Sequence, residues 1–229
     1  MLITKRRSKP AAGHAHESDS RAAHRTFDFG HGQVRAARHV NPDGSQGGWV
    51  ADSAHVDMDT YVSPTAAVFG NARVFGACRI EADAAVLDFA RVADGARISG
   101  SAQVRGTASV TGSVVTNRAV VKDGACVVNG AFVSDDAVVG DRARLSGPAT
   151  KVGGAAQISG DAWVSGGTLV IGTSVVRGKI SDGSIVLGGT IEATDNLAGP
   201  AQAPAPVIGR VVQADEPLRG RPVTVSTSA

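Results

Sequence analysis

The chain has 229 residues, a formal net charge of +2 at pH 7, 29 glycines and only 4% aromatic residues. This length suits one large domain or a solenoid with tails. The scarcity of aromatic residues argues against an ordinary globular core. The near-neutral net charge gives no electrostatic reason to expect a nucleic-acid or acidic partner.

The two cysteines, Cys78 and Cys126, are too few for a disulfide framework, so we expect two free thiols. No apolar run is long enough to span a membrane. The first four residues lead directly into Lys5, Arg6 and Arg7 without an apolar segment, so we expect no signal peptide and a cytoplasmic location.

Residues 1–26 are polar and basic and have no hydrophobic periodicity, which predicts a disordered arm. Its candidates for contact with an anionic surface are Lys5, Arg6, Arg7 and Lys9. A solvated terminus without a partner is the alternative interpretation.

Residues 27–48 form the next segment, in which the alternation around Phe27 and Phe29 predicts short strands. Asn41-Pro42-Asp43-Gly44 predicts a turn. Because a solenoid exposes its apolar interior at each end, we expect residues 27–48 to be an N-terminal cap.

Residues 49–192 repeat a six-residue unit: a small residue, any residue, an aliphatic residue, and a turn rich in Gly, Asn and Asp. Residues two apart in a strand face the same way, so the small and the aliphatic residue both point inward. Three units would form one 18-residue coil, which predicts an all-β, parallel β-helix of roughly seven or eight coils. The inward aliphatic residues are Val50, Val56, Val62, Val68, Val74, Ile80, Val86, Val92, Ile98, Val104, Val110, Val115, Val121, Val127, Val133, Val139, Leu145, Val152, Ile158, Val164, Val170 and Val176.

The spacing is irregular in three places. A five-residue step reaches Val115, and a seven-residue step with Gly147-Pro148 reaches Val152. Beyond Val176 the register loosens, which predicts a frayed last coil. Residues 193–229 are Pro-rich and predict an extended or flexible tail, in which Val211-Val212 is a candidate edge strand.

The repeats resemble the left-handed β-helix hexapeptide-repeat family, through Gly47-Gly48-Trp49-Val50 and units such as Gly70-Asn71-Ala72-Arg73-Val74-Phe75-Gly76. The resemblance covers residues 48–192 and is greatest to uncharacterised bacterial and phage proteins of the YdcK type. It implies a left-handed coil, and it implies either acyltransferase activity or polymer formation.

One of the three predicted sides has short apolar outward residues over most of its length. A soluble monomer rarely exposes so continuous a patch, so we expect another subunit or residues 198–215 to cover it. We favour a homo-oligomer, with a trimer preferred and a filament as an alternative. The candidate oligomer-face residues are Ala67, Phe69, Ala85, Leu87, Val120, Val138 and Val175.

Catalytic groups are scarce in the repeats. Of six histidines only His55 lies there, which excludes a three-histidine metal site in the stack. His55 is the one candidate for the general base of a hexapeptide acyltransferase, with a solvent-facing strand residue as the alternative. No residue near Cys126 resembles a base that could activate it, and Cys78 occupies an inward position. Asp135, Asp136 and Asp141 could bind a cation weakly or form a polar turn.

The sequence therefore favours a structural or self-assembling β-helical scaffold without catalytic activity, cofactor or metal. Two alternatives remain open. One is an acyl-CoA-dependent acyltransferase of the hexapeptide type, and the other is a binding module that uses the basic N-terminal arm.

Overall fold

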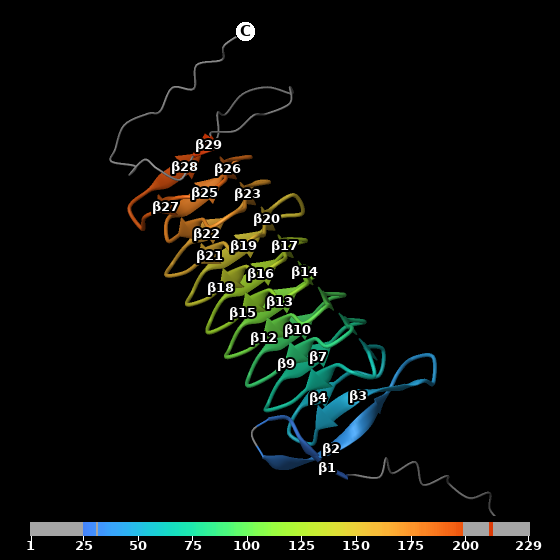
Figure 1. Ribbon diagram of the computed structural model, residues 1–229. Helices are drawn as coiled ribbons and strands as arrows, with labels where there is room; N and C mark the ends of the chain where they lie inside the picture. The colour runs from blue at the N-terminus through green and yellow to red at the C-terminus, as the bar shows by residue number, and fades with distance from the viewer. Residues whose placement is uncertain (1–24, 31, 199–210, 213–229) are drawn as a thin grey trace, which may run out of the picture.

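The computed structural model describes residues 25–30, 32–198 and 211–212. These residues contain no helix and form a parallel β-solenoid of about eight turns, as predicted (Figure 1). Short strands on three faces stack along the axis of the rod, and each face is one continuous sheet. We call the sheets A, B and C.

Sheet A begins with three antiparallel strands and continues with parallel ones. Its order is β1 (Arg25–Asp28), β2 (Gln33–Val40), β3 (Gln46–Ala51), β6 (Ala67–Val68), β9 (Ala85–Val86), β12 (Gln103–Val104), β15 (Val120–Val121), β18 (Val138–Val139), β21 (Gln157–Ile158), β24 (Val175–Val176) and β27 (Thr190–Ile191).

Sheets B and C are parallel throughout. Sheet B consists of β4 (His55–Val56), β7 (Arg73–Phe75), β10 (Arg91–Ala93), β13 (Ser109–Thr111), β16 (Cys126–Val128), β19 (Arg144–Ser146), β22 (Trp163–Val164), β25 (Lys179–Ser181) and β28 (Asn196–Ala198). Sheet C consists of β5 (Tyr61–Val62), β8 (Arg79–Ile80), β11 (Arg97–Ile98), β14 (Val114–Val115), β17 (Phe132–Val133), β20 (Lys151–Val152), β23 (Leu169–Val170), β26 (Ile185–Val186) and β29 (Val211–Val212).

The inward columns follow the predicted register. Val92 pairs with Val74 below it and Val110 above it, and the column continues through Val127 to Leu145. All five side chains are fully buried. Alternation along each two- or three-residue strand therefore suffices to build the core.

The small inward position preceding each aliphatic residue also behaves as predicted. Where alanine is replaced by a hydroxyl residue, the hydroxyl donates to a nearby backbone carbonyl: Thr168 to Ser165 at 2.6 Å, and Ser174 to Ile171 at 2.6 Å. Such a bond removes the cost of burying a polar group in the narrow interior. Thr60 is the exception, because its buried Oγ1 has no hydrogen-bond partner among the described residues.

The corners between sheets require left-handed backbone. Among the described residues, ten other than glycine have positive φ, and eight of these are Asp or Asn, such as Asp135 with φ of 60°. Asp and Asn tolerate this region better than other L-residues. The Gly, Asn and Asp of the sequence repeat thus mark the turns of the coil.

The two irregular steps in the middle are absorbed at corners, so that Val115 still pairs with Ile98 and Val152 with Val133. The predicted fraying after Val176 is wrong. Ile180, Val186 and Ile191 are buried, and the stack continues in register through β28. The shorter step to Ile180 fits because Gly178 lies against the next coil, where a Cβ would collide with the backbone oxygen of Glu192.

The termini of the sequence are only partly described. Lys5, Arg6, Arg7 and Lys9 lie outside the described residues, as does most of the segment 198–215. Val211 and Val212 pair with Ile185 and Val186, which confirms the predicted edge strand. This strand extends sheet C and not sheet A.

Candidate functional site

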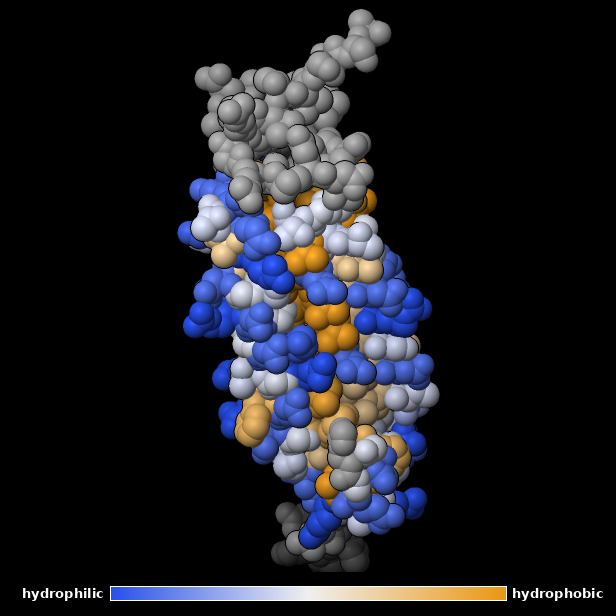
Figure 2. All heavy atoms as spheres, turned by 60° about the vertical axis from the view of Figure 1, so that its left-hand side comes forward, coloured by the Kyte–Doolittle hydropathy of each residue, from blue (hydrophilic) through white to orange (hydrophobic). Residues whose placement is uncertain are grey.

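The outward face of sheet A is the apolar side predicted from the sequence. Its outward column joins Trp49, Ala67, Ala85, Gln103, Val120, Val138, Gln157 and Val175 in register. Phe69 and Leu87 follow the strands β6 and β9 on the same side. Figure 2, which brings the side of β9, β12, β15 and β18 forward, shows apolar atoms in a stripe along the rod.

The apolar stripe is partly covered by its own fold and partly interrupted. The seven candidate oligomer-face residues are all half-buried in the single chain. Gln103 and Gln157 are exposed and divide the stripe into segments. Val120 and Val138 are direct partners on adjacent strands, and they form an apolar segment of the stripe between these two glutamines.

The N-terminal end of the stripe is packed against strand β1 and the residue that follows it. The Phe27 ring stacks on Trp49 and the Phe29 ring stacks on Phe69, each with centroids 4.7 Å apart. The Arg38 guanidinium also lies over the Trp49 ring, 4.6 Å from its centroid. From the sequence we expected another subunit or residues 198–215 to cover this face, and in the single chain its first coils are covered by N-terminal aromatic rings.

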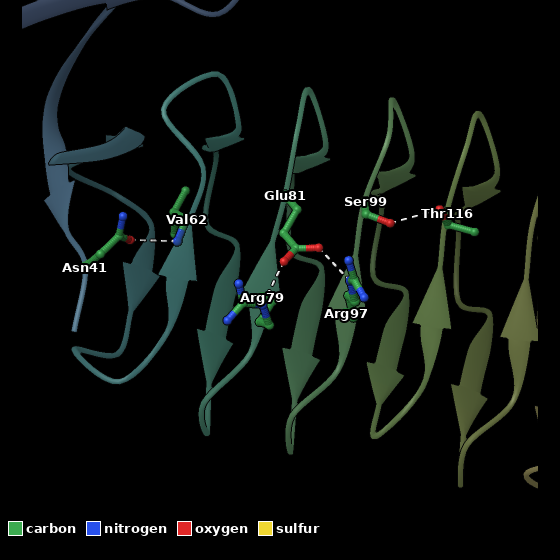
Figure 3. A network of polar contacts seen from close by, with 7 residues as sticks. All are labelled: Asn41, Val62, Arg79, Glu81, Arg97, Ser99 and Thr116. Atoms are coloured by element: carbon green, nitrogen blue, oxygen red, sulfur yellow. Dashed lines mark hydrogen bonds and ion pairs between the residues drawn. The ribbon is translucent and has the colours of Figure 1, made fainter. Parts of the chain in front are cut away.

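Strand β2 and the turn after it close the edge of the first coil. Asn41 Oδ1 accepts a hydrogen bond of 2.8 Å from the backbone N–H of Val62, a residue of the first strand of sheet C (Figure 3). His39 Nε2 lies 2.9 Å from the backbone oxygen of Thr60. These side chains occupy backbone groups that a preceding strand would otherwise pair with, so this end offers fewer free edge groups for end-to-end stacking.

His55 is exposed on sheet B, and its Nε2 lies 2.9 Å from Asp57 Oδ1. A carboxylate next to an imidazole can orient a general base. The nearest residue in register on the next strand is Arg73. The arrangement supplies a base and its orienting group on an open strand surface.

The three aspartates considered as a cation site are not brought together. Asp135 and Asp136 lie at the corner before β18, whereas Asp141 lies at the corner after it. Asp135 accepts bonds from Asn117 Nδ2 and Gly154 N, both at 2.9 Å, and Asp141 accepts one from Gly160 N at 2.7 Å. The carboxylates of Asp135 and Asp141 each accept a hydrogen bond from the backbone of the next coil, which is a structural role.

Asp136 forms a bidentate pair with Arg118, with both distances 2.6 Å. This pair lines a shallow depression at the same corner together with Gly100, Ser101, Asn117 and Asp135. Hydrogen bonds from the Gly154 N–H and Asn117 lower the pKa of Asp135, so its carboxylate is charged at neutral pH. Arg118 pairs with Asp136 in the same depression.

Glu81 forms the centre of a polar cluster on sheet C (Figure 3). Its two carboxylate oxygens accept from Arg79 Nε at 2.7 Å and Arg97 Nε at 2.5 Å. Partial burial raises the pKa of Glu81, but the bonds to the two arginines outweigh this effect and lower it overall. The carboxylate therefore separates two cations that face each other on neighbouring strands.

The two cysteines are free, and they differ in accessibility. Cys78 is fully buried in a small inward position, where burial raises the pKa of its thiol. Cys126 is half-buried on the outside of sheet B.

Within the described segments, no group of His, Cys, Asp and Glu side chains could hold a metal ion. Residues 25–30, 32–198 and 211–212 also contain no helix that could cross a membrane.

The chain matches no family model, and no curated protein matches it either. The candidate site that the structure offers is therefore a surface, the apolar stripe of sheet A.

Proposed function

We propose that this protein is a non-catalytic β-solenoid scaffold that associates side by side with copies of itself through sheet A. The observation that carries the proposal is the in-register apolar column around Val120 and Val138. The backbone of these strands is already paired above and below, so an incoming chain buries side-chain area and not edge hydrogen bonds. Burial contributes roughly 2.5 kcal/mol per 100 Å² of apolar area, before the costs of association.

Lateral association is favoured over end-to-end polymerisation by the capped N-terminal edge. Strand β2 covers β3, and Asn41 and His39 occupy backbone groups of the first coil. Prisms with three flat faces can pack around a threefold axis, so a trimer remains the preferred assembly. The interface would lie between the Phe29–Phe69 contact and Val175.

The test is the mass of the full-length protein in solution, measured by light scattering for wild type and Val138→Arg. Val114→Arg is the matched control, because Val114 is an outward, half-buried valine on sheet C. We expect an oligomeric wild type, folded monomers for Val138→Arg and an unchanged assembly for Val114→Arg. A monomeric wild type would contradict the proposal. So would a Val138→Arg variant that loses thermal stability without a change of mass, which is the result expected if residues 198–215 covered the face.

A second candidate function rests on the His55–Asp57 pair. An acyl-CoA-dependent acyltransferase would use His55 as the general base toward a hydroxyl or amine, with Asp57 orienting the ring. This candidate predicts acetyl-CoA binding by wild type and loss of turnover in His55→Ala. Absence of acetyl-CoA binding at millimolar concentration would remove it.

A further inference from the structure

Sheet B carries two pairs of outward cations, separated by Ser109 and Cys126, that form no ion pair within the described residues. Its exposed outward side chains include Arg73, Arg91, Arg144 and Lys179. Across the described part of the chain, none of these four takes part in an ion pair. The net charge of +2 for the whole chain hides this uneven distribution.

Several cations elsewhere on the rod have carboxylate partners, whereas others, such as Arg105 and Lys151, form no ion pair within the described residues. Arg118 and Arg142 form bidentate pairs with Asp136 and Asp161 at the corners. On sheet C, Arg79 and Arg97 also face each other on adjacent strands, and Glu81 binds both. Where two arginines face each other on sheet C, a carboxylate thus binds both of them.

Arg73 and Arg91 have the same geometry as the sheet C pair but lack its carboxylate. They are direct partners on adjacent strands, where like charges are destabilising. The residue two positions after Arg73, which corresponds to Glu81 on sheet C, is Phe75, and the Arg91 guanidinium lies 5.5 Å from its ring centroid. The two facing guanidinium groups form no ion pair within the described residues, so both are free to contact an external anion.

An exposed aromatic ring lies among the remaining cations. Trp163 is 50% exposed and pairs with Arg144 on one neighbouring strand and Lys179 on the other. An indole ring flanked by two cations provides a stacking surface next to two anion contacts. Proteins that bind single-stranded nucleic acid combine these two elements along one surface.

We propose that sheet B binds single-stranded nucleic acid lying along the rod axis, with phosphates on Arg73, Arg91, Arg144 and Lys179 and a base stacked on Trp163. Six strand steps separate Arg73 from Lys179, which corresponds to about 29 Å at the usual inter-strand spacing. A flat face with one free ring suits an unstacked base and not a duplex. The surface is separate from sheet A, so the inference does not depend on the proposed self-association.

The first experiment measures binding of a fluorescently labelled 20-nucleotide oligo-dT to the full chain by anisotropy, over a range of salt concentrations. Arg91→Gln/Arg144→Gln is compared with Arg118→Gln/Arg142→Gln, which removes the same charge from the corners. Each phosphate contact changes the slope of log K against log salt by about 0.7 for a single strand. We expect the sheet B variant to lose about 1.4 from this slope and the corner variant to keep the wild-type slope. Equal losses in both variants, or no binding by wild type, would overturn the proposal.

The second experiment tests the proposed stacking of a base on Trp163 by tryptophan fluorescence. Oligo-dT should quench the tryptophan fluorescence of wild type, and Trp163→Ala should abolish most of this quenching, since the other tryptophan, Trp49, is packed under Phe27. Base stacking predicts a loss of affinity of about fivefold or more in Trp163→Ala. Unchanged quenching in that variant would contradict the base contact. Binding of a polyuronate without binding of oligo-dT would identify the partner as an acidic polysaccharide and overturn the nucleic-acid assignment.

Discussion

Phe29 stacks on Phe69 with ring planes inclined by 19°, and this contact joins the residue after the first strand to the apolar face of the solenoid. Removing the ring in Phe29→Ser should destabilise the N-terminal end by about 1–2 kcal/mol, through lost burial and lost ring contact. Thermal unfolding measures the effect. Phe89→Ser is the matched control, because Phe89 is 62% exposed and no aromatic contact involves it in the described structure. Equal melting temperatures for the two variants would show that the stacked pair contributes nothing.

Val92 lies in the middle of the inward column of sheet B and is fully buried. Val92→Asp would place an unpaired charge in a dry interior, and we expect a loss of about 3 kcal/mol or more in the free energy of unfolding. Urea denaturation gives this value. Ser109→Asp, an outward position on the same sheet, should stay close to wild type. A Val92→Asp variant as stable as wild type would refute the inward register.

Val92 also shows how far the sequence could predict the fold. Two-residue alternation and six-residue spacing fix which side chain points inward, because the strands of the coils are short and most corners repeat. The contact of Phe29 with Phe69 has no such repeat, since it joins a non-repeating strand to the stack. The sequence could not locate it.

The regular register of the stack past Val176 was not predicted, for a related reason. The spacing to Ile180 is too short for the repeat, and only the close approach of Gly178 to the next coil makes it fit. The candidate oligomer-face residues all lie along sheet A, but whether a second copy binds there is a property of two molecules. The proposed nucleic-acid face was not predicted, although the 18-residue period of the sequence aligns Arg73 with Arg91.

Substitutions of Asp135 can distinguish the effect of backbone strain on stability from the effect of side-chain hydrogen bonds at one corner. Its φ of 60° suits glycine, and its carboxylate binds Asn117 and the Gly154 N–H. Asp135→Gly loses only the hydrogen bonds, whereas Asp135→Ala also places a Cβ in left-handed backbone without a compensating polar side chain. We expect the alanine variant to be less stable than the glycine variant by about 1 kcal/mol, and both to be less stable than wild type. Chemical denaturation at pH 7 ranks the three proteins, and an alanine variant above the glycine variant would contradict this account of the corner.

Glu81 should make stability depend on pH in the acid range. Its folded pKa lies below its ordinary value of 4.5, because the bonds to Arg79 and Arg97 outweigh partial burial. Between the two values the unfolded chain binds more protons than the native one, so the free energy of unfolding rises with pH there. The contribution is complete above the unfolded pKa and is lost as pH falls through the folded pKa.

Glu81→Gln removes this titration and leaves the two arginines facing each other without a counter-charge. We expect the difference in unfolding free energy between wild type and Glu81→Gln to be largest at pH 6–7, and to shrink as the pH is lowered below about 4. Urea denaturation at each pH unit from 3 to 7 measures it. Glu192→Gln is the control for removing one carboxylate, since Glu192 contacts a single arginine at 3.5 Å. A wild-type advantage over Glu81→Gln that stays constant down to pH 3 would show that the carboxylate acts through packing and not through its charge.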